Sequence, residues 1–277
     1  MVAVSAWWVP AGAKVSRMSI DYTRQGHVVT ITINRPETRN ALDMAHFHSL
    51  AQAWARFRDD DAARVAVITG VDDVFFTGAD LKKFVPELTG ELPRPAGWAQ
   101  DDALHAVLHQ FPIYKPIIAA VNGLCIGGGM VLLSSTDLRV ASPAARFAIM
   151  EPKRGLFAGG GTTVRYPRQM PWAHAMELLL TADLVSAERA MLMGVLNDVV
   201  AADRLLEAAY DYADRIAANA PLAIAATKQA ALEGLALELE AAYANEARLN
   251  DMVFASEDAK EGPLAFAEKR PPVWTGR

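Results

Sequence analysis

Residues 117–129, with the sequence IIAAVNGLCIGGG, constrain the fold more than any other part of this chain. A run of short apolar side chains precedes an Asn-Gly turn, and three consecutive glycines follow it. Apolar runs bounded by turn residues are typical of buried strands. The apolar residues 130–133, directly after the glycines, indicate the start of a helix. This segment therefore predicts a buried strand, a tight turn and a helix in close succession.

The triple glycine Gly127, Gly128 and Gly129 has two interpretations. Glycine has no Cβ, so a second chain segment or a ligand can approach its backbone closely. The first N–H groups of a helix lack partners inside it and suit an oxygen that carries negative charge. The glycines either supply half of an oxyanion hole or only allow a helix to pack tightly against a strand.

The composition of the 277-residue chain fits one large domain, or one domain with a small appendage. A net charge of −5 gives no electrostatic reason to expect a nucleic acid or an anionic membrane as partner. No apolar run reaches the roughly 18–20 residues that span a bilayer. The single cysteine, Cys125, excludes an intrachain disulfide and suits a reducing compartment. We therefore expect a cytoplasmic protein.

Residues 1–17 have no basic start and only a short apolar patch, so they make a poor signal peptide. We interpret them as a disordered extension or an over-assigned start. The following residues divide the chain into an α/β core over 18–200 and a helical region over 201–277. Alternating or continuous apolar residues predict strands at 29–33, 64–70, 117–121, 137–142, 146–149 and 195–200.

Apolar residues at helical spacing predict the helices. Phe47, Leu50, Trp54 and Phe57 mark a helix that Asn40 is suited to cap. Another begins at Leu81, and the proline- and glycine-containing residues 86–101 resemble a flexible insert over a pocket. Further helices are predicted at 102–110, 162–169, 172–181, 186–193, 203–219, 222–233 and 236–254, with Ser186 as an N-cap.

Five motifs in series carry a family resemblance. They are NRPETRNAL (34–42), FFTGADLKKF (75–84), KPIIAAVNGLCIGGGMVL (115–132), ARFAIMEPKRGL (145–156) and FAEKRPPVW (266–274). In this order they resemble the crotonase superfamily, the enoyl-CoA hydratase/isomerase family, over residues 19–275. The resemblance implies a spiral of ββα turns with two near-perpendicular sheets. It also implies a C-terminal α-helical trimerisation region, and hence a homotrimer or homohexamer.

The same resemblance implies an acyl-CoA thioester as substrate, with coenzyme A only as part of that substrate and with no other cofactor and no metal. The shared chemistry is an enolate held by two backbone N–H groups, which match those of Ala79 and Gly128. Removing a proton next to a carbonyl moves charge onto the carbonyl oxygen. Fixed N–H donors stabilise that charge, and losing one donor costs about 10²–10³ in rate.

Hydratases of this family use two glutamates, and only one has a counterpart here. The first position is Val131, which can neither hold a water nor exchange a proton. The second is Glu151, whose ordinary alternative is a surface carboxylate paired with Lys153 or Arg154. If Glu151 is the base, partial burial beside Met150, Leu156 and Phe157 should raise its pKa.

A single carboxylate opposite an oxyanion hole suits the movement of one proton between two carbons. The sequence therefore favours Δ3 to Δ2 enoyl-CoA isomerisation. Slow hydration by Glu151 alone and non-catalytic acyl-CoA binding remain as alternatives.

The resemblance also implies which residues bind the substrate, and it places the two loops along the path of the coenzyme A portion. Six of them lie in two loops and three lie elsewhere in the chain: Arg39, Ala41, Leu42, Thr77, Gly78, Asp80, Gly127, Gly159 and Lys269. Lys269, from the same or a neighbouring subunit, suits a phosphate, although a solvated tail is its ordinary role. For Gly159, close packing is the alternative.

Other candidate residues lack support. His105 and His109 have the spacing of a metal pair on a helix, but a third ligand is not evident. Cys125 has no nearby histidine in the sequence and is expected to be a buried hydrophobic residue. The glycine runs match neither the phosphate-loop pattern nor the dinucleotide-binding pattern.

Overall fold

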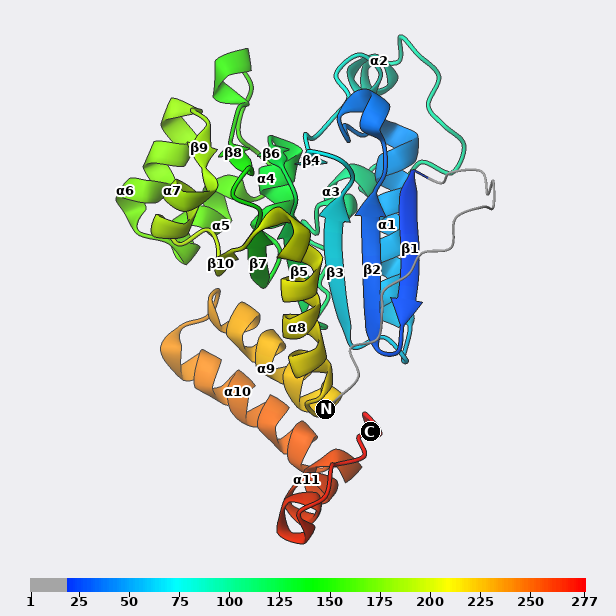
Figure 1. The fold of residues 1–277 in the computed structure, drawn as a ribbon, viewed down its shortest axis with the longest axis vertical. Helices are drawn as coiled ribbons and strands as arrows, with labels where there is room; N and C mark the ends of the chain where they lie inside the picture. Colours follow the sequence, from blue (N-terminus) through cyan, green and yellow to red (C-terminus); the bar gives the residue numbers. More distant parts are fainter. Residues whose placement is uncertain (1–18) are drawn as a thin grey trace.

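The computed structural model describes residues 19–277, so the expectation for residues 1–17 lies outside the described part of the chain. The described residues form an α/β fold with two sheets, as predicted (Figure 1). In them the larger sheet has six strands, in the spatial order β1-β2-β3-β5-β7-β10. Their bounds are β1 Ile20–Gln25, β2 Val28–Ile33, β3 Val65–Gly70, β5 Ile117–Val121, β7 Leu138–Ala141 and β10 Asp198–Val199.

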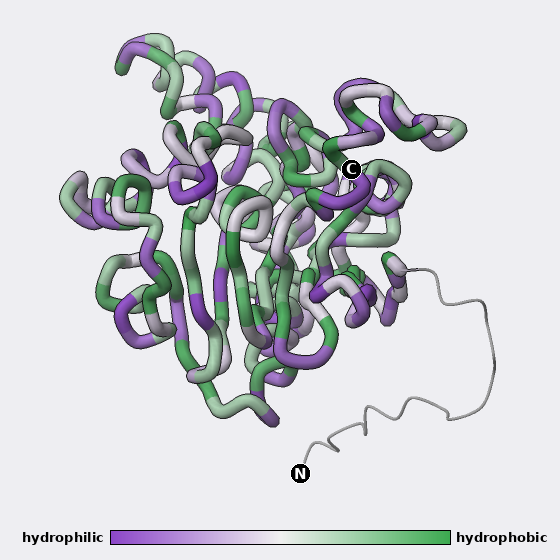
Figure 2. Tube along the Cα trace, turned by 90° about the horizontal axis from the view of Figure 1, so that it is seen from above, coloured by the Kyte–Doolittle hydropathy of each residue, from purple (hydrophilic) through white to green (hydrophobic). Residues whose placement is uncertain are grey.

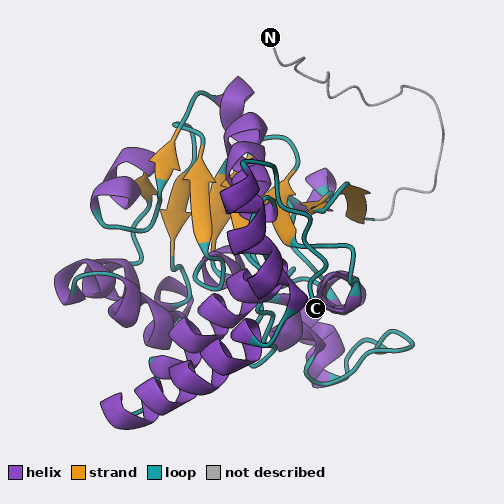
Figure 3. Ribbon diagram, turned by 90° about the horizontal axis from the view of Figure 1, so that it is seen from below, coloured by secondary structure: helices purple, strands orange, loops and turns teal. Residues whose placement is uncertain are grey.

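The smaller sheet has four strands within the described residues, in the order β4-β6-β8-β9. They are β4 Val74–Phe76, β6 Leu124–Ile126, β8 Arg146–Ala148 and β9 Val185–Ser186. Neighbouring strands run parallel except for the pairs β1–β2 and β8–β9. In Figure 3 strands lie side by side at the centre of the molecule, with helices around them.

The α-helices are distributed along the whole described chain. They are α1 Met44–Asp59, α2 Phe84–Thr89, α3 Asp102–Ala106, α4 Gly128–Leu133, α5 Thr162–Gln169, α6 Trp172–Met176, α7 Ala187–Leu192, α8 Leu205–Ala217, α9 Pro221–Gly234, α10 Leu239–Phe254 and α11 Glu257–Glu268. A π-helical turn at Glu177–Thr181 continues α6. Most predicted helices are therefore present, with shifted ends.

The larger sheet is buried on both faces, which explains its continuous apolar strands. On β3, Val65 and Val67 face α8, where Ala209 packs in the same buried cluster. Ala66 and Ile68 point to the opposite face and join the main core with α1. Figure 2 shows hydrophobic residues concentrated along the central strands. The period of two along a strand thus assigns successive side chains to two different cores.

The predicted capping of α1 was wrong. Asp43, not Asn40, caps the helix, because its side chain accepts a hydrogen bond from the His46 amide. Asn40 is fully buried and instead accepts from the Arg35 amide and donates to the Val74 carbonyl at 2.7 Å. It therefore ties the loop after β2 to β4. The spacing of the apolar residues on α1 was predicted correctly.

Two other boundaries differ from the prediction. The helix expected from Leu81 begins at Phe84, because the Asp80 carbonyl accepts hydrogen bonds from the Lys83 and Phe84 amides in a turn. Residues 86–101, expected as an irregular insert, begin with the second half of α2. Helix α11 was not predicted, although Ser256 caps it through the Ala259 amide.

Helices α9, α10 and α11 extend away from the two sheets (Figure 1). They expose large apolar side chains, among them Leu239, Phe254 and Phe266, which is 87% exposed. The predicted trimerisation through this region stays a prediction. Among the helices of residues 19–277, none combines the length and the apolar character needed to cross a membrane.

Candidate active site

The smaller sheet brings three distant segments together at one edge. Strands β4, β6 and β8 are neighbours and run parallel. The carboxyl ends of parallel strands meet at the same edge of a sheet. The turn at residues 77–80, the glycines 127–129 and the segment 149–151 leave these three strands in that order. The predicted catalytic residues are thus neighbours in space although they span 73 positions of the chain (79 to 151, inclusive).

The glycines are required by close backbone packing. A Cβ on Gly129 would lie 2.1 Å from the Phe76 carbonyl oxygen. Gly127 has φ +54° and ψ −121°, and its amide donates to the Ala148 carbonyl at 3.1 Å. On the facing turn, a Cβ on Gly78 would lie 2.7 Å from the Gly128 nitrogen. Close packing therefore requires these glycines, and it places the Gly128 amide directly beside Gly78 without excluding the oxyanion-hole interpretation.

The orientation of the Ala79 amide follows from its neighbours. The Leu42 amide donates to the Gly78 carbonyl at 2.9 Å, and the Asp80 amide donates to the Leu42 carbonyl at 2.8 Å. A trans peptide directs its C=O and N–H to opposite sides. Since the Gly78 carbonyl points toward Leu42, the Ala79 N–H points away from it.

Both predicted oxyanion donors lack a hydrogen-bond acceptor in the described part of the chain. Gly128 opens α4, so its N–H has no partner within the helix. Among residues 19–277, neither the Ala79 amide nor the Gly128 amide donates a hydrogen bond to the backbone or to a side chain. Two unpaired N–H groups on adjoining turns are the elements of an oxyanion hole.

Glu151 presents its carboxylate to the glycine turn. Its backbone carbonyl accepts from the Arg154 and Leu156 amides, which fixes the main chain here. Its Oε1 lies 3.7 Å from the position that a Cβ on Gly127 would occupy. Its Oε2 is inaccessible to solvent and has no hydrogen-bond partner among the described residues.

The surface ion pair that was the alternative for Glu151 is absent from the described residues. Lys153 pairs with Asp183 at 2.6 Å, and Arg154 donates to the Met150 carbonyl at 3.1 Å. Burial raises the pKa of Glu151, while the positive charge of Arg154 partly opposes that rise. Burial and an unpaired oxygen are the conditions under which a carboxylate binds a proton from a substrate.

Val131 lies in the first turn of α4 and is only 6% exposed. A Cβ on Gly160 would lie 2.7 Å from its Cγ1, so the side chain is pressed against the segment before α5. An aliphatic side chain neither donates nor accepts a hydrogen bond. This position therefore supplies no second proton-transfer group.

The two loops predicted to contact coenzyme A lie against one another. The Thr77 hydroxyl donates to the Arg39 carbonyl at 2.8 Å, and the Leu42–Ala79 bridge joins the loops. Arg39 has a left-handed backbone with φ +55°. The set Arg39, Ala41, Leu42, Thr77, Gly78 and Asp80 is thus contiguous with the Ala79 amide.

Two further predicted substrate contacts, Gly159 and Lys269, do not adjoin the two loops in the same way. The Gly159 amide donates to the Phe157 carbonyl at 2.8 Å, so this N–H already has a partner. Lys269 follows the last turn of α11, which lies at the far end of the molecule from β4 and α4 (Figure 1). Within one chain, Lys269 is therefore not brought to the other predicted residues.

Sequence reasoning missed the residues that hold β4 in place. The Asn122 side chain accepts from the Gly70 amide at 3.1 Å and donates to the Val74 carbonyl at 3.0 Å. Asn40 donates to the same carbonyl. A signal was present, because an asparagine before glycine commonly bonds nearby backbone groups. Its actual partners, far along the chain, had no sequence signature.

The remaining candidate residues, Cys125 and His105, are packed against other parts of the protein. Cys125 is fully buried, and burial raises the pKa of its thiol. His105 packs against Phe111 with ring centroids 4.8 Å apart. In the described part of the chain, no group of three or more histidine, cysteine or acidic side chains is arranged to hold a metal ion.

Comparison with known proteins gives one consistent result. The family model described as enoyl-CoA hydratase/isomerase matches residues 23–277. The chain is 40% identical to (E)-benzylidenesuccinyl-CoA hydratase of Thauera aromatica, over 94% of this chain and 100% of that protein. It is 39% identical to carnitinyl-CoA dehydratase of Proteus mirabilis, over 94% and 99% of the two chains.

A solved structure shows the same fold. The crystal structure of enoyl-CoA hydratase from Mycobacterium tuberculosis H37Rv matches with a TM-score of 0.85 and 38% identity. The match covers 94% of this chain and 99% of that one. With a family model that covers most of the chain, these relatives show that the protein belongs to the enoyl-CoA hydratase/isomerase family, the crotonase superfamily, and is an acyl-CoA enzyme.

Proposed function

We propose that this protein moves the double bond of a 3-enoyl-CoA to the 2,3 position. The observation that carries the proposal is a single half-buried carboxylate, Glu151, which faces the glycine turn, together with an aliphatic residue at Val131. Moving one proton between two carbons needs one acid–base group. Adding water across a double bond is best served by two such groups.

The reaction proceeds through an enolate. The Glu151 carboxylate removes a proton from the carbon next to the thioester carbonyl, and the electron pair moves onto the carbonyl oxygen. The N–H groups of Ala79 and Gly128 donate to that oxygen and stabilise its charge. Glu151, now protonated, returns the proton to the γ-carbon of the acyl chain, and the double bond forms between the α- and β-carbons.

The raised pKa of Glu151 suits this exchange. An acid–base group works best when its pKa lies near the working pH, because it must both take up and release the proton. Burial disfavours the carboxylate and raises its pKa. Among the described residues Oε2 has no hydrogen-bond partner, so no existing bond has to break when the carboxylate takes up a proton.

The substrate is an acyl-CoA, and no metal or separate cofactor is part of the proposal. Residues 39–42 and 77–80 adjoin the Ala79 amide and form the path for the coenzyme A portion. Lys269 reaches the phosphates from a neighbouring subunit of a homotrimer or homohexamer. Gly127 allows the thioester to approach the Gly128 amide, because a side chain there would lie against Glu151.

The experiment measures both reactions on the same protein. Wild type is incubated with a 3-enoyl-CoA, and the appearance of the conjugated thioester is followed by absorbance. In parallel, loss of the conjugated thioester from a 2-enoyl-CoA reports hydration. Isomerisation that exceeds hydration supports the proposal, and the reverse ratio contradicts it. Binding of both thioesters with no turnover favours a non-catalytic acyl-CoA binding protein.

Hydration is the second candidate, and the names of two relatives favour it. They are a hydratase and a dehydratase of acyl-CoA thioesters, at 40% and 39% identity. In this reaction Glu151 alone activates the water and the same amides hold the enolate. The parallel assay separates the two reactions, because isomerisation produces the conjugated thioester whereas hydration consumes it.

A further inference from the structure

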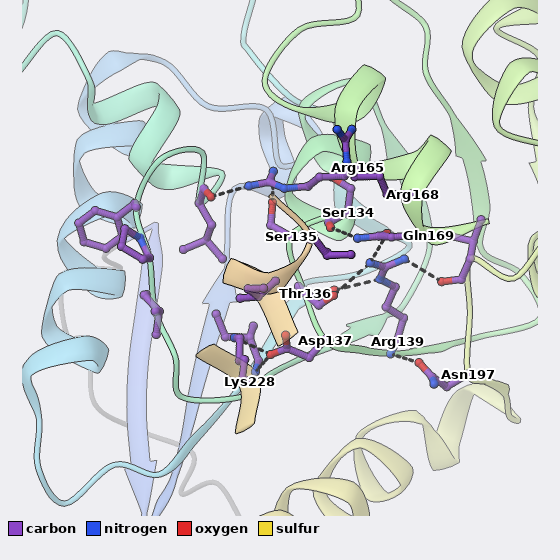
Figure 4. A pocket seen from close by; sticks show the side chains of 18 of the residues that line it. Ser134, Ser135, Thr136, Asp137, Arg139, Arg165, Arg168, Gln169, Asn197 and Lys228 are labelled. Carbon is purple, nitrogen blue, oxygen red and sulfur yellow. Dashed lines mark hydrogen bonds and ion pairs between the residues drawn. The ribbon is translucent and has the colours of Figure 1, made fainter. Parts of the chain in front are cut away.

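A cleft lies at the end of α4 that is remote from the candidate active site. It begins after the last residue of the helix, at Ser134, whereas the candidate active site lies at Gly128, its first residue. Its volume is about 620 Å³, within the usual range for small-molecule sites. The walls come from the chain before β5, the start of β7, the second half of α5 and one face of α9 (Figure 4).

Four cationic side chains line this cleft, namely Arg139, Arg165, Arg168 and Lys228. Lys228 pairs with Asp137 at 2.7 Å. Among the described residues, no carboxylate lies within 4.0 Å of any of the three arginines. With one carboxylate, Asp137, against four cations, the lining carries a net charge of +3.

Arg139 is the most buried of the four and is only 6% exposed. Its guanidinium donates to neutral acceptors, namely the Thr136 carbonyl and hydroxyl, the Val195 carbonyl and the Gln169 side chain (Figure 4). A buried charge with only neutral partners is costly unless a counter-charge is supplied. Burial lowers the pKa of Arg165, and the charge of Arg139 lowers it further, so these guanidiniums repel one another.

Capping of α4 accounts for only part of this arrangement. Arg139 donates to the Thr136 carbonyl and Arg165 to the Ser135 hydroxyl at 2.6 Å, just beyond the helix end. A guanidinium has five N–H groups. Among the described residues, Arg165 uses two of them and Arg168 uses one. Both side chains therefore keep donors for a ligand.

We propose that this cleft binds the phosphate group of a small molecule, at a site separate from the acyl-CoA site. Several positive charges suit a dianion, and the guanidinium fork matches phosphate oxygens in pairs. Apolar side chains, including Ile113, Leu196 and Leu232, line the rest of the cleft and leave room for a non-polar portion of the ligand.

The test uses the full-length protein and inorganic phosphate as the probe. Phosphate binding is measured by titration calorimetry at constant ionic strength, with sodium chloride as the reference salt. Wild type is expected to bind phosphate saturably. Arg165→Gln is expected to weaken this binding at least about tenfold. The matched control is Arg215→Gln on α8, an exposed arginine outside the cleft that pairs with Asp211 and lies over the Tyr212 ring.

Coenzyme A distinguishes the two sites. In the proposed arrangement, saturating coenzyme A leaves phosphate bound to the cleft. Displacement by coenzyme A, unchanged binding in Arg165→Gln, or no saturable binding above the chloride reference would each overturn the proposal. If circular dichroism shows that Arg165→Gln fails to fold, Arg168→Gln makes the same test, because Arg168 is exposed and its one hydrogen bond within residues 19–277 goes to the Val164 carbonyl.

Discussion

The two ends of α4 differ in what they present to a ligand. At Gly128 the chain offers backbone N–H groups, three glycines and one carboxylate, whose pKa the charge of Arg154 lowers against the effect of burial. Beyond Leu133 it offers three arginines and hydroxyls, with Asp137 already paired to Lys228. The first end suits charge that develops during a reaction, as in the proposed isomerisation, whereas the second suits charge that a ligand already carries.

Removing the carboxylate is the strongest test of the first end. Glu151→Gln keeps the size of the side chain but cannot exchange a proton. We expect isomerisation to fall by about 10²–10⁴. Stopped assays with a 3-enoyl-CoA measure the loss, and the surface variant Glu177→Gln, which breaks an ion pair with Arg189, is the control. Full activity in Glu151→Gln would exclude the proposed mechanism.

The same variant makes a prediction about stability. Because burial raises the pKa of Glu151, its ionised form costs the folded state free energy at neutral pH. Glutamine removes that cost, so Glu151→Gln should melt no lower than wild type at pH 7. The advantage should vanish as the pH falls below the ordinary carboxyl pKa of 4.5, where both states of the wild type are protonated. Thermal melts at two pH values measure it.

Displacing the Gly128 amide tests the backbone contribution at the first end of α4. Gly78→Ala places a Cβ 2.7 Å from the Gly128 nitrogen at a φ of +89°. We expect a loss of about 10²–10³ in kcat, the usual cost of one oxyanion donor. Gly90→Ala is a matched control, since Gly90 has a φ of +84° and open space around it. If both substitutions lower kcat equally, the cause is backbone strain and not the position of the Gly128 amide.

Adding a second acid sharpens the contrast between isomerisation and hydration. Val131→Glu is expected to raise the hydration rate by about tenfold or more, because a second carboxyl can move the protons of a water. Val131→Gln has the same length without an ionisable group and is the control. The side chain must fit beside Gly160, so folding is checked by circular dichroism. An equal gain in the glutamine variant would contradict an acid–base origin.

The smallest expected effect concerns pH. The charge of Arg154 lowers the pKa of Glu151 against the larger effect of burial. The base must be ionised, so the rate rises with pH through this pKa. In Arg154→Gln the pKa rises further and the acid limb of the pH–rate profile moves to higher pH. Lys153→Gln, which loses a pair with Asp183 on the surface, should leave the limb in place.

Much of the fold follows from short-range patterns. The apolar residues of α1 and the alternating residues of β2 were recognised because helices and strands repeat with fixed periods. The caps were less predictable, since Asn40 and Asp43 are both good N-cap residues and only their positions in space separate them. Helix α11 was missed because Gly262 and Pro263 interrupt its pattern.

For the site, the sequence by itself determined which residue types are available. The glycines, the single acid at Glu151 and the aliphatic Val131 are visible without coordinates. Only the tertiary structure decided that the Glu151 carboxylate faces Gly127, and that Arg139, Arg165 and Arg168 surround one cleft. The physical reason is that burial and electrostatic interaction depend on distance through space, which is set by the packing of strands and helices far apart along the chain.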